Sequence, residues 1–318
     1  MNWLLPAVSF VVCWLSLDWL LRHDRLPMDH PNARSLHLTP TPRVGGLGIM
    51  AGMMVAGLWL LDGAMLPLML AVCCLSALSV LDDVRGLPVA IRFLAHFVVA
   101  LGYLLTLGLE GWTLLIATLA LVWMTNLYNF MDGSDGLAGG MTVIGFASLA
   151  LAAWHGGSPE LAIFCAAVAT SALAFLRFNF PPAKLFMGDA GSIPLGFLAA
   201  STGILGAQQN LWPWMFPLLV FSPFIADASV TLAKRGLRGE KVWRAHRSHY
   251  YQRVVMLGAS HSQLANAAYA LMLANSTLAF ALLLRPQHTA WLLALWAATY
   301  FLIFLAIDRR WARTGNRS

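Results

Sequence analysis

The chain has 318 residues, of which 59% are hydrophobic and 11% are charged, and its formal net charge is +6. Because soluble domains carry roughly 25% charged residues, this chain lacks the polar side chains that would cover a soluble fold of its length. The composition excludes a soluble protein. It predicts an all-α, polytopic membrane helix bundle, because a segment in lipid must satisfy its backbone hydrogen bonds within a helix.

Apolar stretches long enough to cross a hydrocarbon core of ~30 Å recur along the whole chain. We interpret the first as a retained span and not a cleaved signal peptide, because its basic residues, Arg22 and Arg25, follow the apolar run. No second domain is indicated, so we treat residues 1–318 as a single membrane domain. We expect eleven transmembrane helices, at residues 3–21, 44–61, 64–81, 91–109, 112–128, 137–154, 160–177, 192–207, 211–233, 262–284 and 288–307.

The basic residues are distributed unevenly between the two sets of loops that these spans would create. Of the 20 Lys and Arg residues, all except Arg285 fall on one side. The positive-inside rule then predicts an N-terminus outside and a C-terminus in the cytoplasm. The positive charge is thus a topology signal and an attraction to anionic membrane lipids, so we expect no nucleic-acid partner.

Carboxylates gather on the same side as the basic residues, although they contribute little to topology. Asp82, Asp83, Asp132, Asp135 and Asp189 all fall at cytoplasmic ends of expected spans. An ionisable group at such a position is a candidate functional residue. These five side chains therefore predict a polar site at the inner membrane surface.

The first acidic motif is the adjacent pair Asp82 and Asp83, followed by Arg85. Neighbouring carboxylates repel each other unless a cation is present, so one of them could bind a metal or act as a base while the other tunes it. A solvated helix end with an Asp–Arg pair is the structural alternative.

The second motif spaces Asn126, Asn129 and Asp132 by three residues, which places them on one face of a helix end. Asp135 continues this row if the helix persists, and glycines follow it. Amide and carboxylate oxygens are the ligands of a hard cation, so the motif favours Mg²⁺, with Mn²⁺ as an alternative. A polar loop with turn glycines is the competing interpretation.

The third motif, residues 179–192, places Asp189 directly before an apolar span, at the expected N-terminus of a helix. A phosphate bound there would meet free backbone N–H groups. Asp189 could hold the metal ion that bridges this phosphate, or it could be a structural N-cap.

The fourth motif carries His246 and His249 at positions i and i+3, together with Arg244, Arg247 and Arg253. These side chains form a cationic patch suited to a diphosphate. A zinc pair is a weaker interpretation because no cysteine is nearby, and a generic basic loop remains the structural alternative.

A basic loop over residues 34–48 contains Arg43 and several prolines and glycines. It could grip a lipid phosphate or cover the site. The glycines do not match a nucleotide-binding P-loop.

In this order, the four motifs resemble those of the polyprenyl-phosphate N-acetylhexosamine-1-phosphate transferases, the membrane branch of glycosyltransferase family 4. The resemblance implies transfer from a UDP-N-acetyl sugar to undecaprenyl phosphate in a bacterial inner membrane, giving the undecaprenyl-diphosphate sugar and UMP on the cytoplasmic side. The chain is more similar to initiators of O-antigen and related polysaccharides than to the peptidoglycan precursor enzyme. That enzyme usually has adjacent histidines where this chain has His246 and His249.

The resemblance also implies a role for individual residues. Asp189 matches the metal-binding aspartate, with Asn129 as a companion ligand, and Asp82 matches the proposed base, with Asp83 beside it. Arg85 stands where the family often has lysine, and arginine can hold a phosphate but cannot carry a proton. Asp132 and Asp135 match positions that meet the nucleotide, and Asn179 and Phe186 match uracil-pocket positions. We expect further substrate contacts from Asn126, Arg43 and Arg247, and catalytic roles for His246 and His249.

Several alternatives stay open. Direct attack by the lipid phosphate is favoured over a phospho-aspartate route. A peptidoglycan precursor transferase, a transporter and a lipid-binding scaffold are the other functions considered. A transporter would place ionisable groups near the bilayer midplane, and only Asp227, after Pro223, departs from the surface grouping. The sugar (GlcNAc, GalNAc or a deoxy sugar) and the oligomeric state, a homodimer included, are undetermined.

Overall fold

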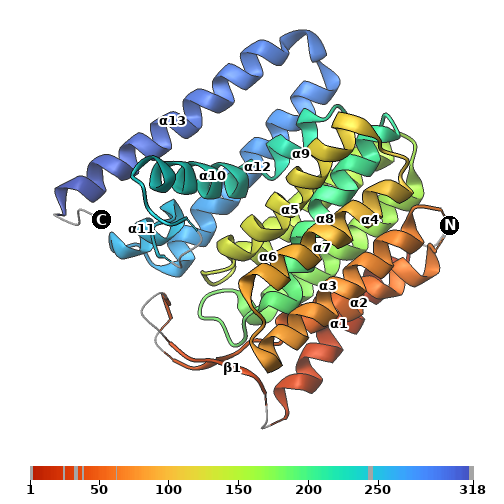
Figure 1. Ribbon diagram of the computed structural model, residues 1–318, viewed down its shortest axis with the longest axis horizontal. Helices are drawn as coiled ribbons and strands as arrows, with labels where there is room; N and C mark the ends of the chain where they lie inside the picture. Colours follow the sequence, from red (N-terminus) through yellow and green to blue (C-terminus); the bar gives the residue numbers. More distant parts are fainter. Residues whose placement is uncertain are drawn as a thin grey trace.

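The computed structural model of the protein describes residues 3–23, 26–31, 35–37, 39–61, 63–242 and 246–314. Within these ranges the chain forms a bundle of long helices with one short two-stranded antiparallel sheet, in which Met28 pairs with Pro42 (Figure 1). The strands are β1 (Met28–Asp29) and β2 (Thr41–Pro42), and they lie at one end of the bundle. We call this the site end.

The bundle consists of the following helices, in chain order. They are α1 (Leu5–Leu21), α2 (Gly45–Trp59), α3 (Met65–Arg85), α4 (Val89–Thr106), α5 (Gly111–Met131), α6 (Leu137–His155), α7 (Pro159–Asn179), α8 (Asp189–Gln208), α9 (Met215–Val220), α10 (Ser222–Leu237), α11 (Tyr250–Met256), α12 (His261–Leu284) and α13 (Thr289–Arg313), with a 3-10 turn η1 (Pro286–His288) before α13.

The chain is a polytopic all-α membrane protein. In the part that the structure describes, eight helices are long and apolar enough to cross a membrane, and α1 and α2 are shorter apolar helices. The prediction of one helix over 211–233 is wrong, because α9 ends at Val220 and α10 begins at Ser222. Pro223 stands in the first turn of α10, where its missing N–H is tolerated. The total of eleven spans and the side of each terminus stay predictions.

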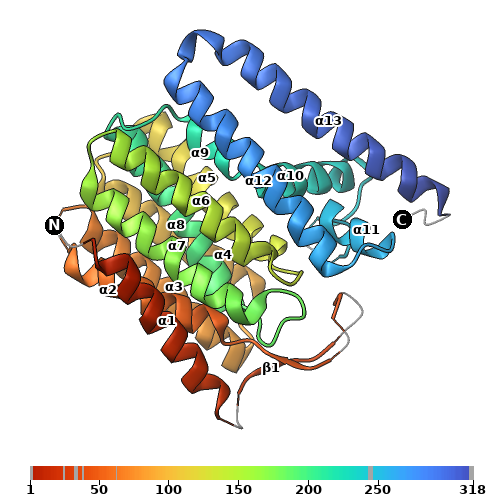
Figure 2. The ribbon, with the colours of Figure 1, turned by 180° about the vertical axis from the view of Figure 1, so that it is seen from behind.

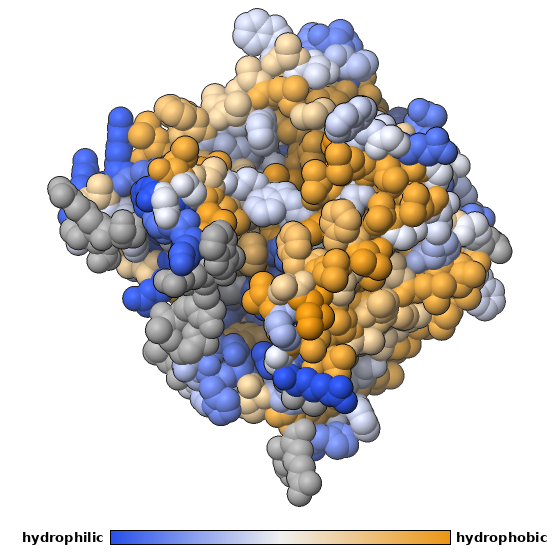
Figure 3. All heavy atoms as spheres, viewed as in Figure 1, coloured by the Kyte–Doolittle hydropathy of each residue, from blue (hydrophilic) through white to orange (hydrophobic). Residues whose placement is uncertain are grey.

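Apolar side chains cover much of the outside of the bundle. Figure 3 shows them spread over the helices, whereas hydrophilic side chains are concentrated toward the ends of the bundle, the site end included. Trp112 is 78% exposed and Trp291 is 80% exposed, and exposure of such large apolar groups is stable only where lipid replaces water.

Helix α8 is the central element of the bundle. Its apolar window is 94% buried, and it packs against α3 and α5. Its first residue, Asp189, therefore lies where the surrounding helices converge. This position explains how one carboxylate can be approached by side chains from several spans.

The start of α2 fixes the start of α8. The N–H groups of Gly45 and Gly46 donate to the carbonyls of Phe186 and Met187, each at 2.8 Å. A Cβ on Gly46 would lie 2.3 Å from the backbone nitrogen of Gly191, so only glycine permits this approach. The segment before Asp189 is thereby held by backbone hydrogen bonds.

The C-terminal part of the chain forms the outer edge of the bundle. Figures 1 and 2 both show α13 running alongside α12, with its C-terminal end near α11. An ion pair between Asp308 of α13 and Arg253 of α11, at 3.0 Å, joins these elements. The last helix therefore reaches back to the site end.

Candidate active site

A polar cavity of about 320 Å³ opens at the site end of the bundle. It receives residues from the β1–β2 segment, the ends of α5 and α7, the start of α8, α11 and α12. It is lined by Asp29, Ser35, Leu36, His37, Arg43, Asn129, Phe130, Asp132, Gly133, Ser134, Asp135, Asn179, Phe186, Gly188, Asp189, His246, Tyr251, Gln252 and His261.

Asp132, Asp189 and the amide of Asn129 form one acidic cluster of this cavity, which Asp29 and Asp135 also line. Asp132 directly follows α5, and Asp189 begins α8. Burial raises the pKa of the Asp132 carboxyl well above its usual range, and the Asp189 charge raises it further, while the Gly188 N–H opposes both. Two buried acids that repel each other favour a bound cation between them.

These residues fit a magnesium ion that is completed by phosphate. Among the described residues, no three His, Cys, Asp or Glu side chains gather into a metal cage. Mg²⁺ does not require one, since it binds through one or two carboxylates and takes its remaining ligands from phosphates and water. Asp132, Asp189 and the Asn129 side-chain oxygen supply that kind of partial ligand set.

The adjacent aspartates of α3 do not line the cavity. Asp83 pairs with Arg43 at 3.1 Å, and Asp82 pairs with Arg92 at 2.7 Å. The second oxygen of Asp82 accepts the Leu87 N–H at 2.7 Å. All four of these charges act on Asp189, so the pair sets the electrostatic field at the start of α8.

The two asparagines outside the acidic cluster bond to backbone. Asn179 accepts the Gly136 N–H and donates to the Leu185 carbonyl, both at 2.9 Å. Its amide therefore ties two loops of the cavity together. Asn126 donates to Val122 of its own helix at 2.7 Å and lies outside the cavity lining.

The loop side of the cavity is formed around Asp135 and Phe186. Asp135 accepts the Ala183 N–H at 3.0 Å and lies 3.8 Å from the His261 ring. The ring of Phe186 stands edge-on to that of His37, with their centroids 4.8 Å apart. A flat, polar ligand would find an aromatic surface and hydrogen-bonding groups on this side.

His246 contributes a neutral imidazole to the cavity. Burial, together with the nearby His249 and Arg235, lowers the pKa of His246 to about 4. The N–H and the hydroxyl of Ser248 approach its Nδ1 at 3.3 and 2.8 Å. Because a backbone N–H can only donate, Nδ1 accepts and Nε2 carries the proton. His246 can thus donate a hydrogen bond to a phosphate without a positive charge.

The expected patch of arginines is not assembled around the histidines. Arg85 and Arg247 are exposed and do not line the cavity. Arg253 is directed to Asp308, and Arg244 lies outside the described residues. His249 is buried behind His246, with its ring centroid 4.8 Å away. In the described chain, Arg43 is the arginine that lines the cavity.

Sequence reasoning missed several lining residues. Ser134, Tyr251 and Gln252 are uncharged residues within the second and fourth motifs, and His261 lies outside all of the motifs. The signal that could have found His261 is weak: it is a polar residue that begins an apolar helix. Its contact with Ser134, at 2.9 Å, joins α12 to the loop after α5.

An apolar groove of about 420 Å³ lies between α5, α8, α9 and α10. On α5 it follows the helical stripe of Ile116, Ala120, Trp123 and Leu127. The next position of this stripe is Phe130, which lines the polar cavity. One helix face therefore leads from the apolar groove to the acidic site.

Comparisons with known proteins identify the family of the chain. The sequence model of glycosyl transferase family 4 matches residues 65–207. The chain is similar to a probable undecaprenyl-phosphate N-acetylglucosaminyl 1-phosphate transferase of Bacillus subtilis, at 30% identity over 302 residues, 88% of this chain and 81% of the relative. A decaprenyl-phosphate N-acetylglucosaminephosphotransferase of Mycobacterium leprae is 28% identical over 291 residues, 76% of this chain and 73% of the relative.

A phospho-N-acetylmuramoyl-pentapeptide-transferase of Levilactobacillus brevis is 36% identical, but over only 143 residues, 45% of this chain and 44% of the relative. All three relatives are membrane enzymes of one class, the sugar-phosphate transferases. With these matches, the chain belongs to the polyprenyl-phosphate hexosamine-1-phosphate transferases of glycosyl transferase family 4.

Proposed function

We propose that this protein transfers an N-acetylhexosamine-1-phosphate from a UDP-sugar to undecaprenyl phosphate, with release of UMP. The position of the acidic cavity and the apolar groove along one face of α5 carries the proposal. A nucleotide sugar needs a polar, cation-binding site, whereas a polyprenyl chain needs an apolar channel. Leu127 lines the groove, and Phe130, one step further along the same face of α5, lines the cavity.

Both substrates are anionic, so their phosphates repel each other until their charges are neutralised. Asp132, Asp189 and Asn129 would hold Mg²⁺, or Mn²⁺ in its place, which supplies charge neutralisation for the diphosphate and the leaving UMP. Arg43, paired with Asp83 at the cavity wall, would attract the lipid phosphate. His246 would donate its Nε2 hydrogen to a phosphate oxygen.

The reaction that we propose is a direct displacement. An oxygen of the lipid phosphate attacks the phosphorus that carries the sugar, a new P–O bond forms, and the bond to the UMP oxygen breaks. At neutral pH most of a phosphate monoester is already ionised, since its second pKa is about 6. Arg92 and Leu87 engage the two oxygens of Asp82, so we assign Asp82 an electrostatic role. Removal of a proton is needed only for the minor fraction of lipid phosphate that is still protonated.

The cellular setting follows from the same hypothesis. We propose that the protein crosses a bacterial inner membrane eleven times, with the N-terminus outside, and that the cavity faces the cytoplasm. The uneven distribution of Lys and Arg supports this orientation. The first membrane step of O-antigen or a related surface polysaccharide is the pathway position we infer.

A donor panel tests the proposal. Purified protein in liposomes that contain undecaprenyl phosphate is given UDP-GlcNAc, UDP-GalNAc, a UDP-deoxy-N-acetyl sugar or UDP-MurNAc-pentapeptide, and the lipid product is weighed by mass spectrometry. One N-acetylhexosamine donor should give the lipid diphosphate sugar. A product from UDP-MurNAc-pentapeptide alone would favour the peptidoglycan function suggested by the partial match, and no lipid product from any UDP donor would refute the proposal.

A further inference from the structure

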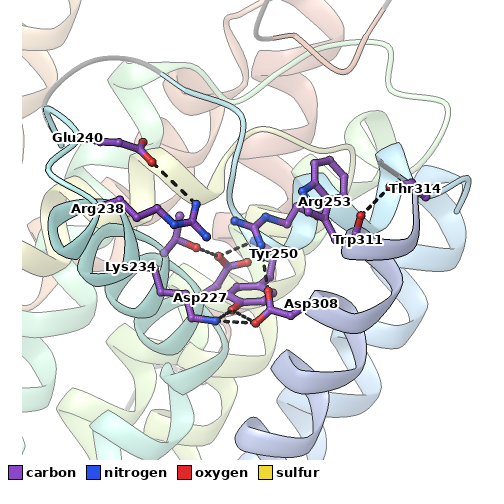
Figure 4. Close-up of polar contacts among 10 residues, drawn as sticks. Asp227, Lys234, Arg238, Glu240, Tyr250, Arg253, Asp308, Trp311 and Thr314 are labelled. Atoms are coloured by element: carbon purple, nitrogen blue, oxygen red, sulfur yellow. Dashed lines mark hydrogen bonds and ion pairs between the residues drawn. The ribbon is translucent and has the colours of Figure 1, made fainter. Parts of the chain in front are cut away.

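The mechanism leaves one buried carboxylate without a role. Asp227 lies in α10 and is only 5% exposed. Its two oxygens accept the N–H groups that begin α11, Oδ1 from Tyr250 at 2.9 Å and Oδ2 from Tyr251 at 2.8 Å. The first N–H groups of a helix have no partner within it. A side chain of another helix, shown in Figure 4, provides that partner here.

The same carboxylate also faces a histidine. Asp227 Oδ1 lies 3.3 Å from Nδ1 of His249, which is 3% exposed. An ionised carboxylate only accepts hydrogen bonds, so Nδ1 carries the proton and Nε2 is left on the far side of the ring. Phe130 and Tyr251 stack on the His249 ring at interplanar angles of 29° and 21°. Its tautomer and its orientation are therefore both set by neighbours.

His249 in turn packs against the histidine that lines the cavity, with ring centroids 4.8 Å apart. We propose that Asp227 is a positioning residue, which fixes the start of α11 and the tautomer of His249 so that His246 presents its Nε2 hydrogen to the donor diphosphate. The inference rests on the proposed function, in which His246 contacts the donor. Asp227 touches no substrate and acts through His249.

A second carboxylate supplies a matched comparison. Asp308 of α13 also holds α11, through Arg253 at 3.0 Å and the Tyr250 hydroxyl at 3.1 Å, and it pairs with Lys234 (Figure 4). These bonds are made to the side chains of Arg253, Tyr250 and Lys234 and do not involve His249. Loss of Asp308 weakens the support of α11 without changing the imidazole. Asp227→Asn and Asp308→Asn thus separate positioning from general stability.

The experiment measures kcat, KM for the UDP-sugar and thermal stability of the purified enzyme in liposomes. Asp227→Asn should lower kcat about 10- to 100-fold and change KM by less than about threefold. Asp308→Asn should lower the unfolding temperature at least as much, yet change kcat by less than about threefold. An equal loss of kcat in both variants, or a normal kcat in Asp227→Asn, would overturn the proposal.

A double-mutant cycle with His249→Gln tests the route of the effect. If Asp227 acts through His249, the double variant should be within about twofold of the slower single variant, because coupled residues are not additive. If the fold-losses of kcat in the two single variants multiplied in the double variant, the proposal would be contradicted.

A readout without turnover separates this inference from the proposed function. Nitrogen NMR of ¹⁵N-histidine-labelled protein should contain one imidazole with a hydrogen-bonded proton on Nδ1, absent in His249→Gln and altered in Asp227→Asn but not in Asp308→Asn. An unaltered signal in Asp227→Asn would refute the positioning role even if the enzyme proved inactive with UDP-sugars. If the His249 signal responded to the variants as expected but no sugar phosphate reached the lipid, only the proposed function would be refuted.

Discussion

The side-chain oxygen of Asn129 accepts a hydrogen bond from the Ser192 hydroxyl at 2.7 Å. This bond joins the last turn of α5 to the first turn of α8, so the amide group and Asp189 are held at one place although 60 residues separate them in the chain. The acidic cavity therefore depends on the packing of two spans and not on one loop.

Removal of the Asp189 charge should abolish turnover while the fold persists. Asp189→Asn keeps the size of the side chain and removes one of two repelling carboxylates, so the variant should express and unfold at or above the wild-type temperature. The expected loss of kcat is on the order of 10³-fold, similar to the loss of an electrostatic catalytic group. Asp18→Asn, which changes a surface ion pair with Arg22, is the control. Near-normal activity of Asp189→Asn would contradict the metal assignment.

Removal of divalent ions should stop the reaction reversibly. Treatment with EDTA is expected to abolish UMP release, and Mg²⁺ or Mn²⁺ should restore it. In Asp132→Asn the concentration of Mg²⁺ that gives half of the maximal rate should rise about 10-fold or more. Activity that survives EDTA, in enzyme shown by elemental analysis to be metal-free, would exclude this role for the ion.

The neutral state of His246 predicts a pH dependence of stability. Its pKa is lowered to about 4 in the folded protein, whereas an unfolded chain binds this proton near pH 6.5. The unfolded state therefore takes up the proton first as the pH falls, and folding stability is lost progressively from pH 6.5 to pH 4. Above pH 6.5 the residue contributes no pH dependence.

Thermal unfolding between pH 7.5 and pH 5 measures this effect. The wild-type unfolding temperature should fall more steeply over that range than that of His246→Gln, which has no group to titrate. Parallel curves for the two proteins would mean that His246 is protonated with an ordinary affinity in the folded state.

The contact between the starts of α2 and α8 predicts that Gly46→Ala is damaging. The added methyl group would lie 2.3 Å from the Gly191 nitrogen, and forcing the backbones apart should cost about 1–3 kcal/mol. Activity should fall as well, since Asp189 is two residues from the contact. Gly102→Ala is the matched control, because a Cβ there meets nothing within 4 Å. An unfolding temperature for Gly46→Ala equal to that of Gly102→Ala would contradict the packing.

Blocking the apolar groove should affect one substrate and spare the other. Ala120 lines the groove, so Ala120→Trp should raise KM for undecaprenyl phosphate about 10-fold through lost apolar burial, with KM for the UDP-sugar unchanged. Leu119→Trp, at the neighbouring exposed position outside the groove, should change neither constant. If Ala120→Trp raised KM for the UDP-sugar and not for undecaprenyl phosphate, the groove would not be the lipid channel.

The membrane class and most helices could be predicted from apolar length alone. Long apolar runs become helices because lipid leaves no other partner for the backbone, and each expected span except 211–233 overlaps one helix. The exception depends on where Pro223 falls. A proline inside an apolar run is compatible with either a kink or a new helix start, and tertiary packing decides between them.

The sequence predicts those site residues that share one helix, because their spacing places them on the same face. Asn129 and Asp132 share a helix end, so their joint presence in the cavity follows from the sequence. Side-chain partners from distant segments do not follow in this way. The sequence contains nothing to indicate that Asn179 bonds Gly136, or that Arg253 turns to Asp308. Such pairings depend on which helices pack together.

The central claim is that a sugar phosphate, and not the sugar alone, moves to the lipid. The most direct test supplies UDP-sugar labelled with ³²P in the β-phosphate to purified enzyme and undecaprenyl phosphate in liposomes. The account predicts that the label enters the lipid fraction and that the released UMP is unlabelled. Label that remains in water-soluble UDP while the sugar alone reaches the lipid would contradict it.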